Sequence, residues 1–224
     1  EIAITPNRQD ALGVRGVARD LAAAGLGTLK PNRATFAGQA TGKPALGVSI
    51  ETDNCPAFAY RVIKGVKNGP SPDWMQKKLE AIGLRPISAL VDVTNWMTFD
   101  QARPMHVFDA GKVAGNLVVR QAKAGETLLA LNEKEYTFDE SHTVIADDKG
   151  VESLAGIMGG EESGCSNETV DVVVEAALWN PVNVAQTGRR LGIQSDARYR
   201  FERGVDPSTL LEGMEIATRY IIDM

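Results

Sequence analysis

The sequence predicts an α+β protein with layered, largely antiparallel sheets and helices packed on one side, preceded by a short helical fragment of another domain. Short β-rich segments follow one another from residue 117 onward and are separated by Gly, Asn and Asp turns, which is typical of antiparallel hairpins. Segments with helical spacing stand before and after this region. Helices interspersed with many short strands indicate the α+β class.

The composition is that of an ordinary globular protein. Of the 224 residues, 43% are hydrophobic and 24% are charged, which excludes disordered, collagen-like and membrane-spanning classes. No apolar run approaches the roughly 18 residues of a spanning helix, and the start of the chain lacks the blocks of a signal peptide, so we expect a soluble, cytoplasmic protein. The net charge of −5 provides no general basic field, so any contact with RNA must be local.

The metal-binding residue types are few and scattered. Cys55 and Cys165 form no CxxC pair, and neither His106 nor His142 belongs to an HExxH pattern. We therefore expect no metal site and interpret both cysteines as buried free thiols.

The N-terminal region predicts a helix and then a boundary. Residues 8–24 have apolar positions at helical spacing, with Asn7 or Asp10 as capping candidates and Gly25 at the expected end. Residues 26–45 are rich in Gly, Pro, Thr and Asn without a period, which indicates a linker. The chain begins with Glu rather than Met and stops inside an apolar-periodic stretch, so we expect it to be an excised piece of a longer protein.

The next elements are two strands and two helices. Residues 46–51 and 58–66 cluster β-forming residues. Residues 72–82 predict a short amphipathic helix that Ser71 caps. Residues 87–100 fit a helix better than a strand, although their β-branched content is high.

The remaining segments alternate short strands with turns before two final helices. The strand candidates are residues 117–122, 127–131, 135–138, 143–147, 151–158 and 170–178. The helix candidates are residues 181–191 and 208–222.

Two local patterns leave alternatives open. The glycine-rich stretch 156–164 lacks the spacing of a phosphate or dinucleotide loop, and it indicates either a tight turn or a place where a ligand approaches the backbone. A cation-rich stretch contains Arg189, Arg190, Arg198, Arg200 and Arg203. These arginines would bind phosphate or form salt bridges with the neighbouring acids Asp196, Glu202 and Asp206.

Two further residues carry possible chemistry. His106 lies among apolar residues, which favours a packed role over a catalytic one. Glu175 lies inside the apolar strand candidate 170–178, so it either faces solvent on an outer face or is buried and needs a partner, because an unpaired buried charge is costly.

Five blocks of sequence, in the same order, resemble the beta chain of bacterial phenylalanyl-tRNA synthetase. The blocks are residues 5–20, 91–96 (VDVTNW), 104–109 (PMHVFD), 156–160 (GIMGG) and 200–207 (RFERGVDP). The resemblance implies three parts: residues 1–29 from the end of the first domain, a linker at 30–45, and the editing region formed by the third and fourth domains at 46–224.

The resemblance implies an editing activity, the hydrolysis of tyrosine wrongly attached to phenylalanine tRNA. A pocket shaped for phenylalanine rejects an analogue with one added hydroxyl only about a hundredfold, so a second site must remove the error. Glu175 matches the family position whose carboxylate meets the tyrosine hydroxyl. Phenylalanine would leave this buried acceptor unpaired.

The resemblance also implies two groups of site residues. The residues that would position water and hold the ester and the terminal adenosine are His106, Thr94 and Asn95. The residues that would bind the amino acid are Glu175, Gly159, Gly160, Ser195 and Ala197. In this scheme His106 is a candidate proton acceptor near neutral pH.

This sequence departs from the family pattern at two places. Ser195 stands where Thr is frequent, which keeps the hydroxyl and loses a methyl group. Ala102 and Arg103 stand before Pro104 where a Gly-Gln pair is frequent, which bears on how His106 is presented.

The resemblance places the ATP-binding synthetic centre on the alpha chain. We therefore expect no cofactor or metal in this chain, and ATP and magnesium only in the intact synthetase. The expected partners are phenylalanine tRNA, the alpha chain and tyrosine as editing ligand, without a membrane. Two alternatives are a non-catalytic module that binds tRNA or a subunit, and a sensor of free aromatic amino acids.

Overall fold

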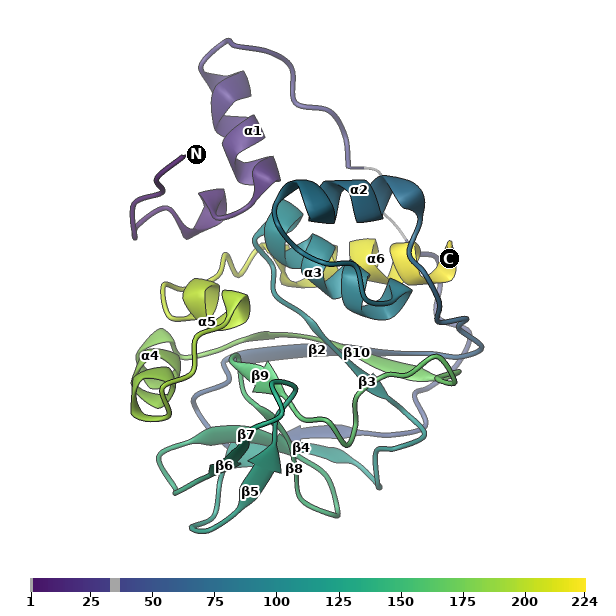
Figure 1. The fold of residues 1–224 in the computed structure, drawn as a ribbon, viewed down its shortest axis with the longest axis vertical. Coiled ribbons are helices and arrows are strands. Elements are labelled where there is room, and N and C mark those ends of the chain that lie inside the picture. Colours follow the sequence, from purple (N-terminus) through teal and green to yellow (C-terminus); the bar gives the residue numbers. More distant parts are fainter. Residues whose placement is uncertain (1, 33–36) are drawn as a thin grey trace.

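The computed structural model describes residues 2–32 and 37–224. In this part of the chain the strands form a five-stranded sheet, a three-stranded sheet and a two-stranded ribbon. Figure 1 shows the three-stranded sheet as a middle layer, with helices over one face and the five-stranded sheet toward the other. In chain order the elements are η1 (Gln9–Ala11), α1 (Val14–Ala23), β1 (Val48–Ile50), β2 (Ala57–Ile63), α2 (Asp73–Ala81), α3 (Ala89–Gln101), β3 (His106–Asp109), β4 (Leu117–Gln121), β5 (Thr127–Leu129), β6 (Glu135–Thr137), β7 (Thr143–Ala146), β8 (Val151–Leu154), β9 (Met158–Gly159), β10 (Val172–Leu178), α4 (Pro181–Arg190), α5 (Asp196–Phe201) and α6 (Thr209–Ile222).

The middle sheet has the order β2-β10-β3, and both pairs are antiparallel. Its central strand β10 is apolar on both faces because each face is covered. Val174 and Ala176 pack into the core shared with α2, α3 and α6, whereas Val173 and Ala177 pack into the core shared with the five-stranded sheet. Alternation along a strand therefore places residue 175 on the side of the five-stranded sheet.

The five-stranded sheet has the order β1-β4-β7-β8-β9. Strands β1 and β4 are parallel, and the other neighbours are antiparallel. The ribbon of β5 and β6 lies beside it, and the isolated bridge between Ala130 and Gly160 joins the two. The predicted α+β class with mainly antiparallel pairing is confirmed.

The helices α2, α3 and α6 cover the outer face of the middle sheet (Figure 1). Met75, Leu90, Val93 and Ile216 supply their buried side chains, so the apolar spacing of these helices faces the sheet. The predicted helix at 87–100 is confirmed despite its β-branched residues. Its packing against α2, α6 and β3 outweighs the small loss of helix stability that β-branched side chains cause.

The N-terminal helix α1 lies against α3. The contact is a close backbone approach, since a Cβ on Gly13 would lie 2.5 Å from the Ala102 nitrogen. The Arg200 guanidinium of α5 also donates to the Leu12 carbonyl at 3.2 Å. These contacts join the N-terminal segment to residues far along the chain.

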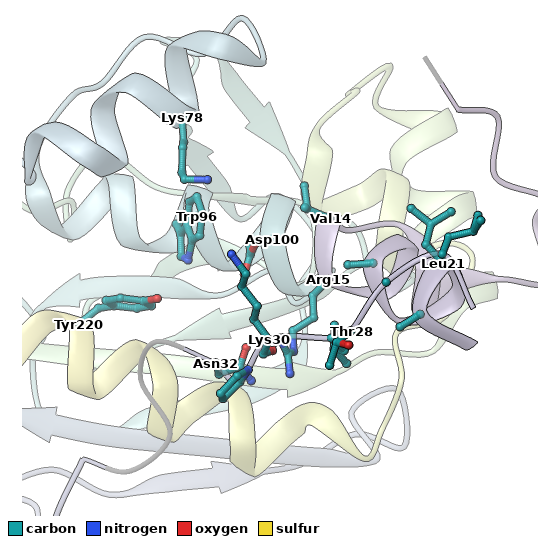
Figure 2. A pocket seen from close by; sticks show the side chains of 16 residues that line it. Val14, Arg15, Leu21, Thr28, Lys30, Asn32, Lys78, Trp96, Asp100 and Tyr220 are labelled. Carbon is teal, nitrogen blue, oxygen red and sulfur yellow. Dashed lines mark hydrogen bonds between the residues drawn. The ribbon is translucent and has the colours of Figure 1, made fainter. Parts of the chain in front are cut away.

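A groove of about 390 Å³ separates α1 and the segment after it from the helices of the outer layer. Figure 2 shows Trp96 and Tyr220 on one side of the groove, Val14 and Leu21 of α1 on the other, and Lys30 between them. The predicted site residues do not line this groove.

The structure corrects the predicted strand at 151–158. Strand β8 ends at Leu154, and a turn leads into the two-residue strand β9. The turn contains Gly156 at a φ of 69°, where a Cβ would lie 2.6 Å from the Trp179 ring. The glycine is needed both for its backbone conformation and for the space above the indole.

The predicted capping residues are also corrected. The helix begins at Val14 with Gly13 at its N-cap, so neither Asn7 nor Asp10 caps it. Ser71 does not cap α2, because its hydroxyl donates to the buried Asp92 carboxylate at 2.5 Å.

The described residues within 30–45 form no helix or strand, as expected of a linker. Residue 1 of the expected piece 1–29 and residues 33–36 of the expected linker lie outside the described residues. The division into 1–29, 30–45 and 46–224 stays a prediction. No described helix is both long and apolar enough to cross a lipid bilayer.

Asp92 connects the start of α3 to the loops before it, so it provides a test of the helical layer. The buried carboxylate accepts from the Ser71 hydroxyl and from the Ile87 N–H at 2.9 Å. We expect Asp92→Ala to lower the free energy of unfolding in urea by about 1–3 kcal/mol, because both donors lose their acceptor. Asp73→Ala, at an exposed position in the first turn of α2, should cost less than about 1 kcal/mol. Equal losses of unfolding free energy in Asp92→Ala and Asp73→Ala would contradict this role of Asp92.

Candidate functional site

A cavity of about 360 Å³ opens where the middle sheet meets the turn between β8 and β9, the helix α5 and one side of α3. Its volume lies within the range of small-molecule sites. The lining residues that the sequence predicted are Thr94, Asn95, His106, Gly159, Glu175, Ser195 and Ala197. The fold therefore brings together seven residues that are spread over about half of the chain.

Glu175 is the buried acid of this cavity. It lies in the centre of β10 with 6% of its surface exposed, which excludes the outer-face interpretation. Among the described residues, none donates a hydrogen bond to its carboxylate. Burial raises the pKa of the Glu175 carboxyl to about 8, and the Arg103 guanidinium limits this rise.

His106 stands directly opposite Glu175 in the β3–β10 register. Opposed residues of an antiparallel pair point to the same face with Cβ atoms about 5 Å apart, so the imidazole and the carboxylate share the cavity. The ring meets Phe108 edge-on with centroids 4.4 Å apart, and Nε2 has no partner in the described part of the chain. Burial lowers the pKa of His106 to about 4, so the imidazole is neutral at pH 7.

Gly159 lies against His106, because a Cβ added to Gly159 would lie 2.2 Å from the His106 Cε1 atom. The missing side chain is therefore what leaves room for the ring. Gly160 lies outside the cavity lining, where its Cβ would meet Leu128 Cδ1 at 2.6 Å. The structure thus gives these adjacent glycines different neighbours.

Helix α3 brings the polar groups Thr94 and Asn95 to the cavity wall, with Thr98 one turn later. The Thr94 hydroxyl donates to the Val91 carbonyl at 2.8 Å, and the Thr98 hydroxyl donates to the Thr94 carbonyl at 2.8 Å. Both hydroxyl protons are used within the helix, so these oxygens can only accept from a ligand.

Ser195 is the N-cap of α5. Its hydroxyl accepts from the Arg198 N–H at 3.0 Å and donates to the Ile157 carbonyl at 2.7 Å. It therefore joins α5 to the turn between β8 and β9. Ala197 in the first turn of α5 presents a small side chain to the cavity.

The apolar walls of this cavity, which include Met158, Trp179 and Phe201, were not predicted from the sequence. Trp179 follows β10 directly, and its large side chain at the end of a predicted strand was the available signal. Strand β3 and helix α5 were also not predicted. Helix α5 is shorter than the windows in which helical periodicity can be recognised.

The cation-rich stretch forms internal ion pairs. Arg198 pairs with Glu202 at 3.0 Å, Arg200 with Asp196 at 3.4 Å, and Arg203 with Glu202 at 2.9 Å. For these three arginines the structure favours the salt-bridge interpretation over phosphate binding.

No group of three or more potential metal ligands occurs among the described residues. Cys55 is buried and Cys165 is half-buried, and both are free thiols. Burial raises the pKa of each thiol to about 12, so both remain protonated at neutral pH.

Comparison with known proteins finds relatives that are similar in sequence over the whole chain. The chain is 62% identical over 229 residues to the phenylalanine–tRNA ligase beta subunit of Rhodopseudomonas palustris, 60% over 230 to that of Bradyrhizobium diazoefficiens and 59% over 227 to that of Brucella suis. Each alignment covers 100% of this chain and 28% of the relative, so the chain spans 28% of the length of these proteins. A crystal structure of an N-terminal fragment of the phenylalanyl-tRNA synthetase beta subunit from Pyrococcus horikoshii matches 84% of this chain and 60% of its own, with 16% identity and a TM-score of 0.48.

A family model described as the B3/4 domain matches residues 54–224, which include every residue of the cavity. The chain belongs to the B3/4 domain family and, over its full length, is similar to a segment of the phenylalanine–tRNA ligase beta subunit.

Proposed function

We propose that this chain is an editing module that hydrolyses the ester between tyrosine and phenylalanine tRNA. The observation that carries the proposal is the Glu175 carboxylate, which is buried in the cavity and receives no hydrogen bond from any described residue. The names of the relatives supply the class of tRNA. In the complete protein the partners would be phenylalanine tRNA and an alpha subunit.

Selection in this scheme depends on the para hydroxyl of the ring. A tyrosine hydroxyl donates to the Glu175 carboxylate and replaces the hydrogen bond of a cavity water. Phenylalanine would displace water from the acid and offer nothing in return, which costs about 1–3 kcal/mol or more for a charged acceptor. The cavity therefore favours tyrosine, the amino acid that a synthetic site for phenylalanine excludes only weakly.

Hydrolysis needs a water molecule at the ester carbonyl. Water adds to the carbonyl carbon, the bond to the ribose oxygen breaks, and tyrosine and free tRNA leave. His106, Thr94 and Asn95 form the wall that would hold the water and the terminal adenosine. Because the imidazole is neutral at pH 7 and weakly basic, we assign His106 the role of accepting a hydrogen bond from the water.

The direct test is release of tyrosine from preformed tyrosyl-tRNA, compared with release of phenylalanine from the cognate ester. Faster release of tyrosine supports the proposal. Binding of tRNA without release would favour the scaffold alternative, and binding of free tyrosine without any need for tRNA would favour the sensor.

Removal of the acid should weaken the preference for tyrosine. At pH 9, where Glu175 is mainly anionic, we expect Glu175→Ala to reduce the ratio of tyrosyl-tRNA to phenylalanyl-tRNA hydrolysis by about tenfold or more, because a charged hydrogen bond contributes about 1.5–3 kcal/mol. The matched control is Glu152→Ala, which removes a second buried glutamate that lies outside the cavity lining. An unchanged ratio in Glu175→Ala would remove the basis of the proposed selection.

A methyl group at Gly159 should disturb the site locally. Since the new Cβ would overlap the His106 ring, Gly159→Ala should lower tyrosyl-tRNA hydrolysis by about a hundredfold, the effect of a displacement near 1 Å in a catalytic group. Gly150→Ala is the control, because its Cβ would meet no atom within 4 Å. Single-turnover rates of both folded variants provide the measurement, and full activity in Gly159→Ala would argue against this cavity.

The preference for tyrosine should increase with pH. The pKa of Glu175 near 8 means that the acid is mainly neutral at pH 6 and mainly anionic at pH 9, and an anion accepts the phenol hydrogen bond more strongly. Calorimetry with non-hydrolysable tyrosyl- and phenylalanyl-adenosine amides should show an affinity ratio that rises about fivefold between these pH values. The ratio should be flat in Glu175→Gln, and a flat ratio in the unmodified chain would refute the charged-acceptor scheme.

A further inference from the structure

Arg103 is a fully buried cation between α3 and β3. Its side chain has 0% exposure, and it follows Ala102, whose φ of 54° ends α3 in the left-handed conformation. It does not line the cavity, and the editing scheme above gives it no role.

Its guanidinium is held by three acceptors from separate segments. It donates to the Ala177 carbonyl at 3.1 Å, to the Thr209 hydroxyl at 2.8 Å and to the Asp206 carbonyl. The register that pairs His106 with Glu175 would place Pro104 opposite Ala177, and proline has no N–H to donate. The Arg103 side chain thus satisfies the β10 carbonyl that the backbone of Pro104 cannot reach.

These three acceptors are neutral, so the positive charge is not cancelled by contact. Among the described residues, no carboxylate forms an ion pair with Arg103. The Asp206 and Glu175 carboxylates are the anions that stabilise its charge, and its pKa of about 10 after burial leaves it cationic at neutral pH. The Ala177 carbonyl that Arg103 binds lies two residues after Glu175 on β10, so the buried guanidinium reaches the strand next to the acid.

Few other charges face Glu175. His106 from β3 is neutral, Tyr60 from β2 donates its hydroxyl to the Leu46 carbonyl, and Cys55 is a protonated thiol. Asp196 from α5 also lines the cavity and pairs with Arg200. Arg61, one register position away on β2, pairs with Glu215 of α6 on the opposite face of the sheet. Among the described residues, Arg103 is therefore the cation placed to act on the Glu175 carboxylate.

We propose that Arg103 is a positioning residue whose fixed charge favours the anionic form of Glu175 and thereby sets the pH range over which the site selects a hydroxylated ring. The inference rests on the proposed function for its biological meaning. Its electrostatic part concerns two side chains of this chain and can be tested without tRNA. A guanidinium fixed by four hydrogen bonds to three acceptors acts on Glu175 through its charge, without moving into the cavity and without occupying the acceptor that the ligand needs.

The test is the titration of the Glu175 carboxyl carbon by NMR in the 224-residue chain labelled with 13C-glutamate. We expect Arg103→Gln to raise the titration midpoint of Glu175 by about one pH unit, the lower end of what a neighbouring guanidinium produces. Arg61→Gln, which removes a cation from the other face of the same sheet, should leave the midpoint unchanged. An unchanged midpoint in folded Arg103→Gln would overturn the inference.

A second replacement separates the charge from the cross-link. Arg103→citrulline, introduced by semisynthesis, keeps the shape and the donors toward Ala177 and Thr209, whereas it removes the charge and the donor toward the Asp206 carbonyl. It should raise the Glu175 midpoint as Arg103→Gln does, and it decides the question where the glutamine variant fails to fold. A midpoint equal to that of the unmodified chain would mean that Arg103 serves only to connect β10 with α6.

The functional readout distinguishes the inference from the proposed function. The pH at which the affinity ratio of the tyrosyl and phenylalanyl amides rises should move upward by the same interval in Arg103→Gln. A shifted NMR midpoint with no tyrosine preference in any variant would refute the editing function and leave the Arg103–Glu175 coupling intact. A tyrosine preference with an unshifted midpoint would refute the coupling alone.

Discussion

The structure depends on placing an acid in a strand that is buried on both faces. Strand β10 is paired on both edges and covered by helices on one side and by the five-stranded sheet on the other. These contacts supply apolar burial at residues such as Val173 and Val174, and they place the Glu175 carboxylate in the cavity rather than on an outer surface. The apolar contacts of the strand therefore offset the cost of a partly desolvated acid.

The cavity is chemically simple because most of its polar groups are already satisfied within the protein. The hydroxyls of Ser195 and Thr94 donate to nearby backbone carbonyls, so they fix the walls in place. Among the described residues none donates to the Glu175 carboxylate, which lies beside His106 in register across two strands and remains for a ligand. A rigid wall with few unsatisfied groups suits recognition of a small ligand by a few directed bonds.

The sequence was informative where periodicity or turn chemistry was strong. The apolar run at 170–178 and the helix at 87–100 were predictable because each spans enough residues to show its pattern. The four-residue strand β3 was not, and neither was the break after Leu154, which depends on the contact between Gly156 and the distant Trp179. The site residues were expected from resemblance to a family, whereas the face toward which Glu175 points and its unsatisfied state required the three-dimensional fold.

The contribution of Arg103 could not be derived from its position in the sequence. It stood out only as a departure from a family pattern, and its significance depends on acceptors at residues 177, 206 and 209. Such contacts between distant segments leave no local signal. The same holds for Gly159, whose partner His106 lies about fifty residues earlier in the chain.

The register between β3 and β10 also bears on how the chain matures during synthesis. The paired positions 106 and 175 lie far apart in sequence, and α5 closes the cavity from still later residues. A nascent polypeptide whose α5 is still inside the ribosome has an incomplete cavity, so the cavity is closed only after this last wall has folded.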